Sequence, residues 1–359
     1  MKLSTRMALA MVVLVLLTTG VLAALTYYNV MSLLLPRVLD RLETHSRVSA
    51  MVLNASLKGL RAETLSLQSS PEIRSLGKLP AGANDNPVIA AELRSQIENQ
   101  LASELAAKPD YTLIRIIGAA NDGKEQIRVD RLGPGGTIRI VPPAELTGRG
   151  DRVCYLEGMA TPPNAVHITK VEINRADHGL VPLSVPIIRA AAPLQGEDGK
   201  VFGVLVINVD LRAAISRIRD TVDSDSELYV VNENGDYLVH PDKSKEFGFE
   251  RGQRQRIQDD FPQFEAVLHD ELPSAQVMTR RDGERYGIGW SWTRLADGPR
   301  VAVVETRSYD VLMSVRSAVS NPDAARRRHR DPVRDHHGDR AVALAEPAIG
   351  TDHPGARRF

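Results

Sequence analysis

The N-terminal part of the chain is dominated by one long apolar stretch. No charged residue occurs between Arg6 and Arg37, and the segment reads MALAMVVLVLLTTGVLAALTYYNVMSLLL. A helix of this length can cross a hydrocarbon layer about 30 Å thick. Lys2 and Arg6 precede it, which favours a cytoplasmic N-terminus. The pattern predicts a cytoplasmic segment at 1–6 and a transmembrane helix at 7–36, with the remaining chain outside.

A cleaved signal peptide is the alternative for this stretch. The sequence VLAA around Ala23 can serve as a processing site, but the apolar residues continue through Leu35. This is well beyond a typical signal-peptide core, so an uncleaved anchor is favoured.

Helical spacing follows the apolar stretch. Val48, Met51, Val52 and Ala55 fall on one apolar stripe, with Leu53, Leu57 and Leu60 beside it. The spacing predicts a long stalk helix at 37–76, whose stripe fits a homodimer. GKLPAGANDNP at 77–87 then marks a loop, and a second helical pattern occupies 90–106.

Short β-like runs begin after Pro109. The predicted strands of the first group lie at 111–118, 124–132, 136–142, 167–173, 187–194 and 201–211. A short helix is predicted at 212–222. A second group has a strand, an Asn-Gly turn and another strand at 227–242, a polar insertion at 243–272, and strands at 274–281, 284–295 and 300–307. The order predicts an α+β chain with two antiparallel sheets flanked by helices.

Composition and motifs exclude several classes of protein. The formal net charge is zero, so no overall positive field favours nucleic acid. Cys154 is the single cysteine and can form neither an internal disulfide nor a cysteine-rich metal site. The sequence contains no nucleophile elbow, P-loop, zinc-protease motif or dinucleotide fingerprint. We therefore expect no catalytic residue, no metal site and no cofactor.

Four segments carry a resemblance to a known family: the anchor with its long helix, YTLIRIIGAANDGKEQIRV, PIIRAAAPLQGEDGKVFGVLVINVDLR and ELYVVNENGDYLVHPD. Together they resemble the double-Cache (dCache, PAS-like) periplasmic sensor region of bacterial histidine kinases, chemoreceptors and diguanylate cyclases. The resemblance implies two tandem Cache modules, a membrane-distal one at 77–215 and a membrane-proximal one at 216–315. It further implies that the distal module holds the ligand pocket and that the proximal module relays the signal in a homodimer.

The resemblance also implies binding residues. Amino-acid-sensing members carry R-x-W-Y and a later aspartate, and RVCY here places Arg152 and Tyr155 on the arginine and tyrosine positions. Cys154 replaces the tryptophan, and Asn174 aligns with the aspartate that holds the ligand's ammonium. An amide is a weaker ammonium partner than a carboxylate. We therefore expect an organic acid bound by Arg152 and not an α-amino acid.

Three other charged residues are candidates because they fall on the predicted sheet or its loops: Arg115, Arg131 and Glu172. A structural salt bridge or a solvated surface position is the alternative for each of them.

The C-terminal residues 321–359 change character. They are rich in arginine, histidine, aspartate and proline without periodicity, which is typical of disorder. DHHGDR at 335–340, read one base later, begins with codons for isoleucine or threonine and then methionine or threonine. We expect that a frameshift has replaced a second membrane helix and the output domain.

These observations favour a ligand-sensing region of a bacterial transmembrane receptor at the inner membrane, with the histidine kinase type preferred over chemotaxis or cyclase outputs. The alternative is a membrane-tethered interaction or solute-capture protein without output. An extracytoplasmic hydrolase has no nucleophile and base to support it.

Overall fold

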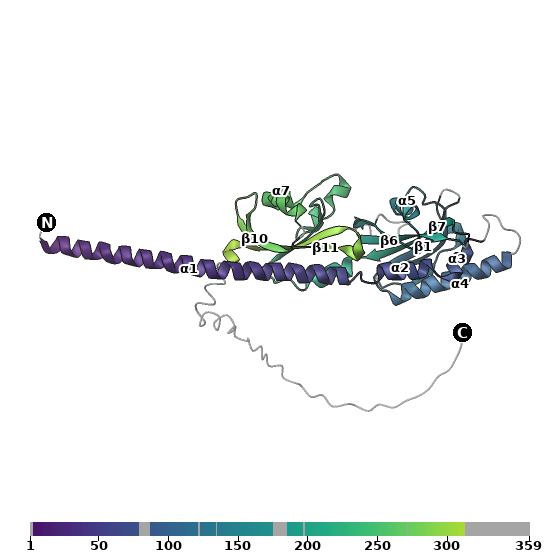
Figure 1. Ribbon diagram of the computed structural model, residues 1–359, viewed down its shortest axis with the longest axis horizontal. Coiled ribbons are helices and arrows are strands. Elements are labelled where there is room, and N and C mark those ends of the chain that lie inside the picture. The colour runs from purple at the N-terminus through teal and green to yellow at the C-terminus, as the bar shows by residue number, and fades with distance from the viewer. Residues whose placement is uncertain are drawn as a thin grey trace, which may run out of the picture. The chain divides into compact units, whose positions relative to one another are not determined.

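The protein is described by a computed structural model with an α+β fold and two antiparallel sheets (Figure 1). The described residues are 3–78, 87–120, 123–133, 135–174, 185–196, 198–270 and 272–312. The predicted tail at 321–359 and its proposed frameshift lie outside these residues. The α+β class and the antiparallel sheets are confirmed.

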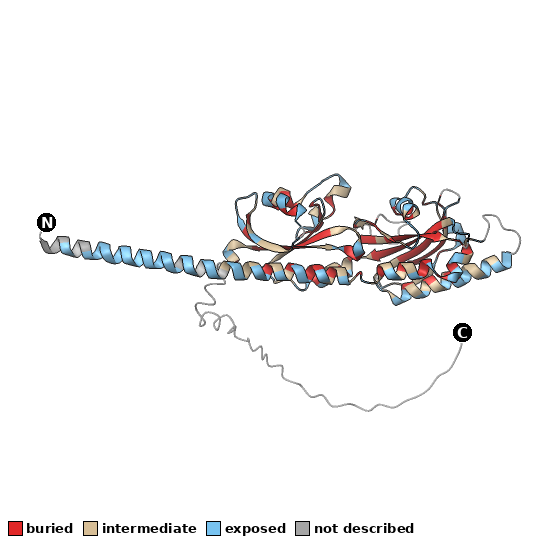
Figure 2. Cartoon of the chain, viewed as in Figure 1, coloured by how far each residue is buried: buried red, intermediate tan, exposed pale blue. Residues whose placement is uncertain are grey.

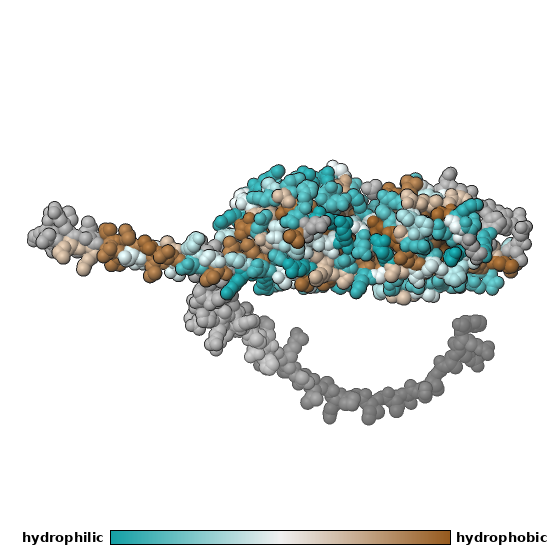
Figure 3. All heavy atoms as spheres, viewed as in Figure 1, coloured by the Kyte–Doolittle hydropathy of each residue, from teal (hydrophilic) through white to brown (hydrophobic). Residues whose placement is uncertain are grey.

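The chain begins with one very long helix, α1 (Leu3–Ala55), which includes Pro36. Large apolar side chains between Met11 and Leu25 are exposed along it, and Figure 3 shows hydrophobic surface on this part of the helix. Among the residues that the structure describes, no helix combines the length and the apolar character needed to cross a membrane.

The predicted stalk helix at 37–76 is not one continuous helix. The structure divides it into the end of α1, α2 (Leu60–Gln68) and α3 (Pro71–Leu76). Gly59 has φ 155°, which is unfavourable for residues with a side chain, and Pro71 cannot donate a backbone hydrogen bond to continue α2. The helical period was therefore interpreted correctly, but the interruption at Gly59 was missed.

The first sheet lies within the module expected at 77–215 and is called the distal sheet. It has the strand order β3-β2-β1-β7-β6-β4, with β5 also paired to β6. Its strands are β1 (Tyr111–Gly118), β2 (Glu125–Arg131), β3 (Ile138–Ile140), β4 (His167–Ile168), β5 (Glu172–Ile173), β6 (Pro186–Gln195) and β7 (Val201–Asp210). Helix α4 (Pro87–Ala107) precedes it, and η1 (Pro143–Glu145) and α5 (Val153–Ala160) lie between β3 and β4. Two strands of two residues each replace the strand predicted at 167–173.

The two faces of the distal sheet differ in chemistry. Strand alternation directs Ile114, Ile116 and Ile207 to one face, where α2 and α4 bury them. The opposite face carries Val204, Val206 and Ala191 under α5, together with charged side chains. Figure 2 shows the strands as the buried layer, with exposed residues on the outer sides of the helices.

Helix α6 (Arg212–Arg219) connects to the proximal sheet, whose order is β10-β11-β12-β8-β9. Its strands are β8 (Glu227–Asn232), β9 (Tyr237–Val239), β10 (Ser274–Thr279), β11 (Arg285–Arg294) and β12 (Arg300–Ser308). The predicted insertion at 243–272 forms η2 (Lys243–Lys245), η3 (Gly248–Arg251), α7 (Ile257–Asp260) and η4 (Pro262–His269), and η5 (Leu295–Asp297) joins β11 to β12. Phe261 and Phe264 from this insertion pack into the core on one face of the sheet.

Helix α1 packs against the other face of the proximal sheet at very short range. A Cβ atom added at Gly289 on β11 would lie 2.4 Å from the carbonyl carbon of Leu42. The sheet therefore buries the side of α1 that carries Leu42 and Leu53 and leaves Val48 and Met51 of the predicted stripe exposed.

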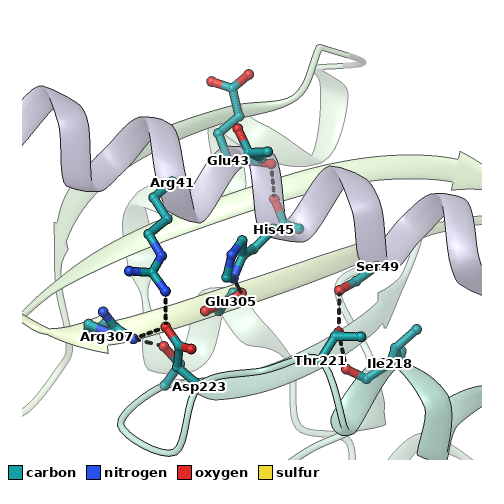
Figure 4. Close-up of polar contacts among 12 residues, drawn as sticks. Arg41, Glu43, His45, Ser49, Ile218, Thr221, Asp223, Glu305 and Arg307 are labelled. Carbon is teal, nitrogen blue, oxygen red and sulfur yellow. Dashed lines mark hydrogen bonds and ion pairs between the residues drawn. The ribbon is translucent and has the colours of Figure 1, made fainter.

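Polar contacts reinforce this packing (Figure 4). Arg41 on α1 and Arg307 on β12 both bind the carboxylate of Asp223, at 2.8 and 2.7 Å. His45 Nδ1 lies 3.6 Å from the Glu305 carboxylate on β12. The helix is thus held to both the sheet and the segment that precedes β8.

Gly289→Ala should destabilise the protein, because the added methyl group collides with the α1 backbone rather than with a movable side chain. We expect a loss of about 1–3 kcal/mol, measured as a lower unfolding temperature. Gly148→Ala is the matched control, since Gly148 has no heavy atom within 4 Å of an added Cβ. Equal stability of the two variants would contradict the close approach.

Glu305→Gln should change how stability depends on pH. Burial raises the pKa of the Glu305 carboxyl above its ordinary 4.5, opposed by a hydrogen bond from Ser226 and the charges of His45 and Arg307. Asp223 adds to the rise. This pKa is higher in the folded state than in the unfolded state. The stability that the Glu305 carboxyl contributes is therefore fully present below pH 4.5 and is lost as the pH rises through its pKa in the folded protein.

The unfolding temperature of Glu305→Gln should therefore increase relative to that of the parent protein as the pH is raised from 4.5 toward neutrality. Glu265→Gln, at an exposed position on η4, serves as the control. A constant difference between Glu305→Gln and the parent across this range would refute the assignment.

Candidate functional site

The charged face of the distal sheet is built by strand register. Arg115 on β1 lies opposite Arg128 on β2, and Arg189 on β6 lies opposite Asn208 on β7. Arg115 and Arg128 are 2% and 3% exposed, respectively. A guanidinium buried to this degree requires a counter-charge or hydrogen-bond acceptors close by.

Glu125 supplies much of that counter-charge. Its carboxylate lies 2.9 Å from Arg115 Nη1, 3.5 Å from Arg149 Nε and 3.9 Å from Arg128 Nη1. It also accepts a hydrogen bond from the Thr147 backbone N–H at 3.2 Å. Asp130 binds Arg128 at 2.9 Å. Buried arginines therefore outnumber the buried carboxylates that neutralise them.

A cavity of about 500 Å³ opens at the edge of this face. Three of the predicted site residues line it: Arg115, Arg152 and Glu172. Arg152 is exposed at the N-terminus of α5, and Glu172 lies on the short strand β5. Cys154 contributes a buried thiol to the same wall. The structure thus brings together half of the residues that the sequence suggested.

Arg189 is the main residue that sequence reasoning missed. Its guanidinium lines the cavity and forms an ion pair with Glu172. Its Nε atom is buried, and among the described residues no hydrogen-bond acceptor reaches it. Burial lowers the pKa of Arg189 to about 10, with the charges of Arg115 and Arg152 acting in the same direction and Cys154 and Glu250 opposing it. The group still carries its positive charge at neutral pH.

The remaining lining comes from three segments. Lys170 and Val171 precede β5, Asp151 precedes α5, and Phe249 and Glu250 lie on η3 of the proximal module. The Glu250 carboxylate accepts a hydrogen bond from the Ile173 backbone N–H at 2.9 Å. Both modules therefore form the cavity wall.

Three predicted site residues lie elsewhere. Arg131 binds backbone carbonyls, including that of Lys108 at 3.2 Å beyond the end of α4 and that of Tyr111 at 3.1 Å. Tyr155 lines a neighbouring cavity and donates from its hydroxyl to the Gly118 carbonyl at 3.5 Å. The Asn174 backbone N–H donates to the Val185 carbonyl at 2.8 Å, and its side chain does not line the 500 Å³ cavity. Arg131 is buried against these backbone carbonyls and does not line the 500 Å³ cavity.

A signal for Arg189 was present in the sequence. IIRAAAP contains one charged residue inside an otherwise apolar strand, and such a side chain must be buried with a partner or directed into a site. Lys170 and Glu250 carry no comparable signal, because they lie in short polar segments whose positions depend on tertiary packing.

A second cavity of about 640 Å³ adjoins the first and shares Cys154, Lys170 and Glu172 with it. Arg61 on α2 lines it and donates hydrogen bonds to the carbonyls of Val166 at 2.9 Å and Ala296 at 3.3 Å. Arg61 therefore joins the stalk to both modules. Within the described ranges, no group of three or more histidine, cysteine or carboxylate side chains is arranged to hold a metal ion.

The sequence matches a model of a known protein family. The model for the sensor domain of bacterial histidine kinases matches residues 89–271, just over half of the sequence. The chain belongs to the bacterial histidine kinase sensor domain family. Residues 89–271 of this sensor domain contain Arg115, Arg152, Arg189 and Glu250, so the family match covers the charged cavity wall.

Several solved structures share the fold of this chain. A domain of a sensory box/GGDEF family protein from Vibrio parahaemolyticus has a TM-score of 0.63 and 17% identity, covering 77% of this chain and 98% of that one. The extracellular domain of a histidine kinase, vpHK1S-Z8, has a TM-score of 0.61 and 17% identity, covering 84% and 97%. The periplasmic sensory domain of the Campylobacter jejuni chemoreceptor Tlp1 has a TM-score of 0.56 and 13% identity, covering 78% and 98%.

At these identities the structures establish the fold of the sensor domain and not its ligand. The sequence-based resemblance to Cache-like sensor regions of histidine kinases and chemoreceptors is confirmed. No curated protein matches the sequence.

Proposed function

We propose that this sensor domain binds a small organic carboxylate in the 500 Å³ cavity and is the ligand-sensing region of a membrane-anchored receptor of the histidine kinase type. The observation that carries the proposal is the convergence of Arg115, Arg152 and Arg189 on one cavity. Arginine forms planar, bidentate hydrogen bonds with carboxylates, and the cavity volume is within the usual range for small-molecule sites.

The charge of the cavity favours an anion over a cation. Four basic side chains line it against three acidic ones, and two of the acidic groups are already engaged: Glu172 pairs with Arg189, and Glu250 accepts a hydrogen bond from the Ile173 N–H. An α-amino acid would need a further acceptor for its ammonium group. Asn174, the residue aligned with that role, does not line the cavity.

Signalling would follow from a difference in ligand affinity between two arrangements of the modules, because a ligand shifts an equilibrium only by that difference. The two modules share one continuous hydrophobic cluster, which includes Ile207 from the distal sheet and Val303 from the proximal sheet. A change in the distal cavity can therefore reach the sheet on which α1 packs.

We also propose that α1 anchors the receptor as a single-pass helix in the bacterial inner membrane, with the sensor domain periplasmic, and that α1 contributes to a homodimer. The uncharged sequence between Arg6 and Arg37 supports the anchor, and the exposed Val48 and Met51 support the dimer.

In a membrane fraction, the full-length protein should resist extraction by alkaline carbonate and be released only by detergent, because an apolar helix of this length partitions into hydrocarbon. A variant with Leu14 and Leu17 both replaced by arginine should be released by carbonate or fail to reach the membrane. Release of the parent protein by carbonate alone would contradict anchoring.

The full-length protein in detergent should bind dicarboxylates such as succinate, detected by calorimetric titration and by a raised unfolding temperature. Arg189→Gln and Arg152→Gln should each weaken binding by about 10- to 100-fold, because each removes hydrogen bonds to a charged group worth about 1.5–3 kcal/mol. Arg74→Gln, at an exposed position on α3 outside the cavity, should bind like the parent.

A panel of mono- and dicarboxylates, amino acids, amines and sugars tests the ligand class. Binding restricted to amines or sugars, or carboxylate binding unchanged in both cavity variants, would disprove the proposal.

A further inference from the structure

The cavity of the distal module contains a carboxylate that belongs to the proximal module. Glu250 lies on η3 and accepts a hydrogen bond from the Ile173 backbone N–H at 2.9 Å, next to β5. Phe249 lines the cavity beside it. The chain therefore already inserts a negative charge into a site whose other walls are rich in arginine.

The segment that presents Glu250 is fixed at both ends. Phe247, which precedes η3, is 3% exposed, has a left-handed φ of 54° and donates its backbone N–H to the Tyr237 carbonyl at 2.8 Å. Arg251, which ends η3, donates to the carbonyls of Ser244 and Glu246 at 2.7 and 2.6 Å. Glu250 is thus positioned by the proximal module and is not a freely moving surface side chain.

Glu250 also acts on the central cation of the cavity. Burial lowers the pKa of Arg189, and the negative charge of Glu250 partly offsets this by favouring the charged guanidinium. Glu172 forms the direct ion pair with Arg189 from the distal module itself. Two carboxylates of the chain, one from each module, therefore stabilise the guanidinium before any ligand binds.

We propose that Glu250 is an intrinsic competitor for anionic ligands, so that a carboxylate entering the distal cavity weakens the contact between Glu250 and Ile173. This inference rests on the proposed function and adds to it a residue that sets affinity and links the two modules. A second anion near Arg189 is repelled by Glu250, and the repulsion is relieved when η3 moves away from β5. Since coupling free energies are reciprocal, the contact that is lost on binding must also reduce ligand affinity.

Two substitutions separate the charge from the hydrogen bond. Glu250→Gln removes the charge but keeps an oxygen that can accept from Ile173 N–H, whereas Glu250→Ala removes both. Both variants should bind succinate at least about fivefold more tightly than the parent, the lower end of typical coupling effects. Glu265→Gln, which removes an exposed charge from η4 of the same module, should bind succinate like the parent.

Amide hydrogen exchange at Ile173 gives a readout that affinity alone does not provide. In the parent, succinate should speed exchange at Ile173, because the acceptor on Glu250 is withdrawn. In Glu250→Ala the amide should exchange rapidly with or without succinate, and in Glu250→Gln succinate should change its exchange less than in the parent.

The outcomes distinguish this inference from the proposed function. Succinate binding by the parent that is unchanged in Glu250→Gln and Glu250→Ala, or protection of Ile173 that increases with succinate, would overturn the role of Glu250 and leave the carboxylate site standing. Absence of succinate binding in the parent and in both Glu250 variants would overturn the inference together with carboxylate binding at this cavity.

Discussion

The burial of several arginines on one face of the distal sheet is the constraint on which the rest of this structure depends. The guanidinium groups of Arg115, Arg128 and Arg149 cannot be buried without a counter-charge. The Glu125 carboxylate forms ion pairs with all three. At the edge of the face, Arg189 pairs with Glu172 but retains a buried Nε atom that no acceptor among the described residues satisfies. A buried donor without an acceptor costs stability, so its presence at a cavity is a reason to expect a ligand there.

The same constraint explains why the cavity wall includes residues of the proximal module. Arg189 needs negative charge, and the chain draws it from Glu172 in the distal module and Glu250 in the proximal one. The hydrogen bonds of Arg61 to the carbonyls of Val166 and Ala296 form a second connection from the stalk to both modules.

Most elements of the fold could be predicted because their patterns are local. The hydrophobic run at 111–118 coincides with β1, and the helix predicted at 90–106 lies within α4. The errors have local causes as well: Gly59 interrupts the stalk, and α5 was missed because RVCY was interpreted as a binding motif and not as the start of a helix. The face of α1 that packs could not be predicted, since Gly289 of β11, which admits the α1 backbone, is distant in sequence.

The sequence by itself determined the α+β class, the family and three residues of the cavity, because these depend on periodicity and on short segments such as RVCY. Only the tertiary structure decided that Arg131 binds backbone carbonyls near the end of α4, that Tyr155 and Asn174 lie outside the cavity, and that Arg189 and Glu250 belong to it. The physical reason is that a charged side chain is given its role by the partners available where it is buried. Those partners come from strands and modules that are brought together only by folding.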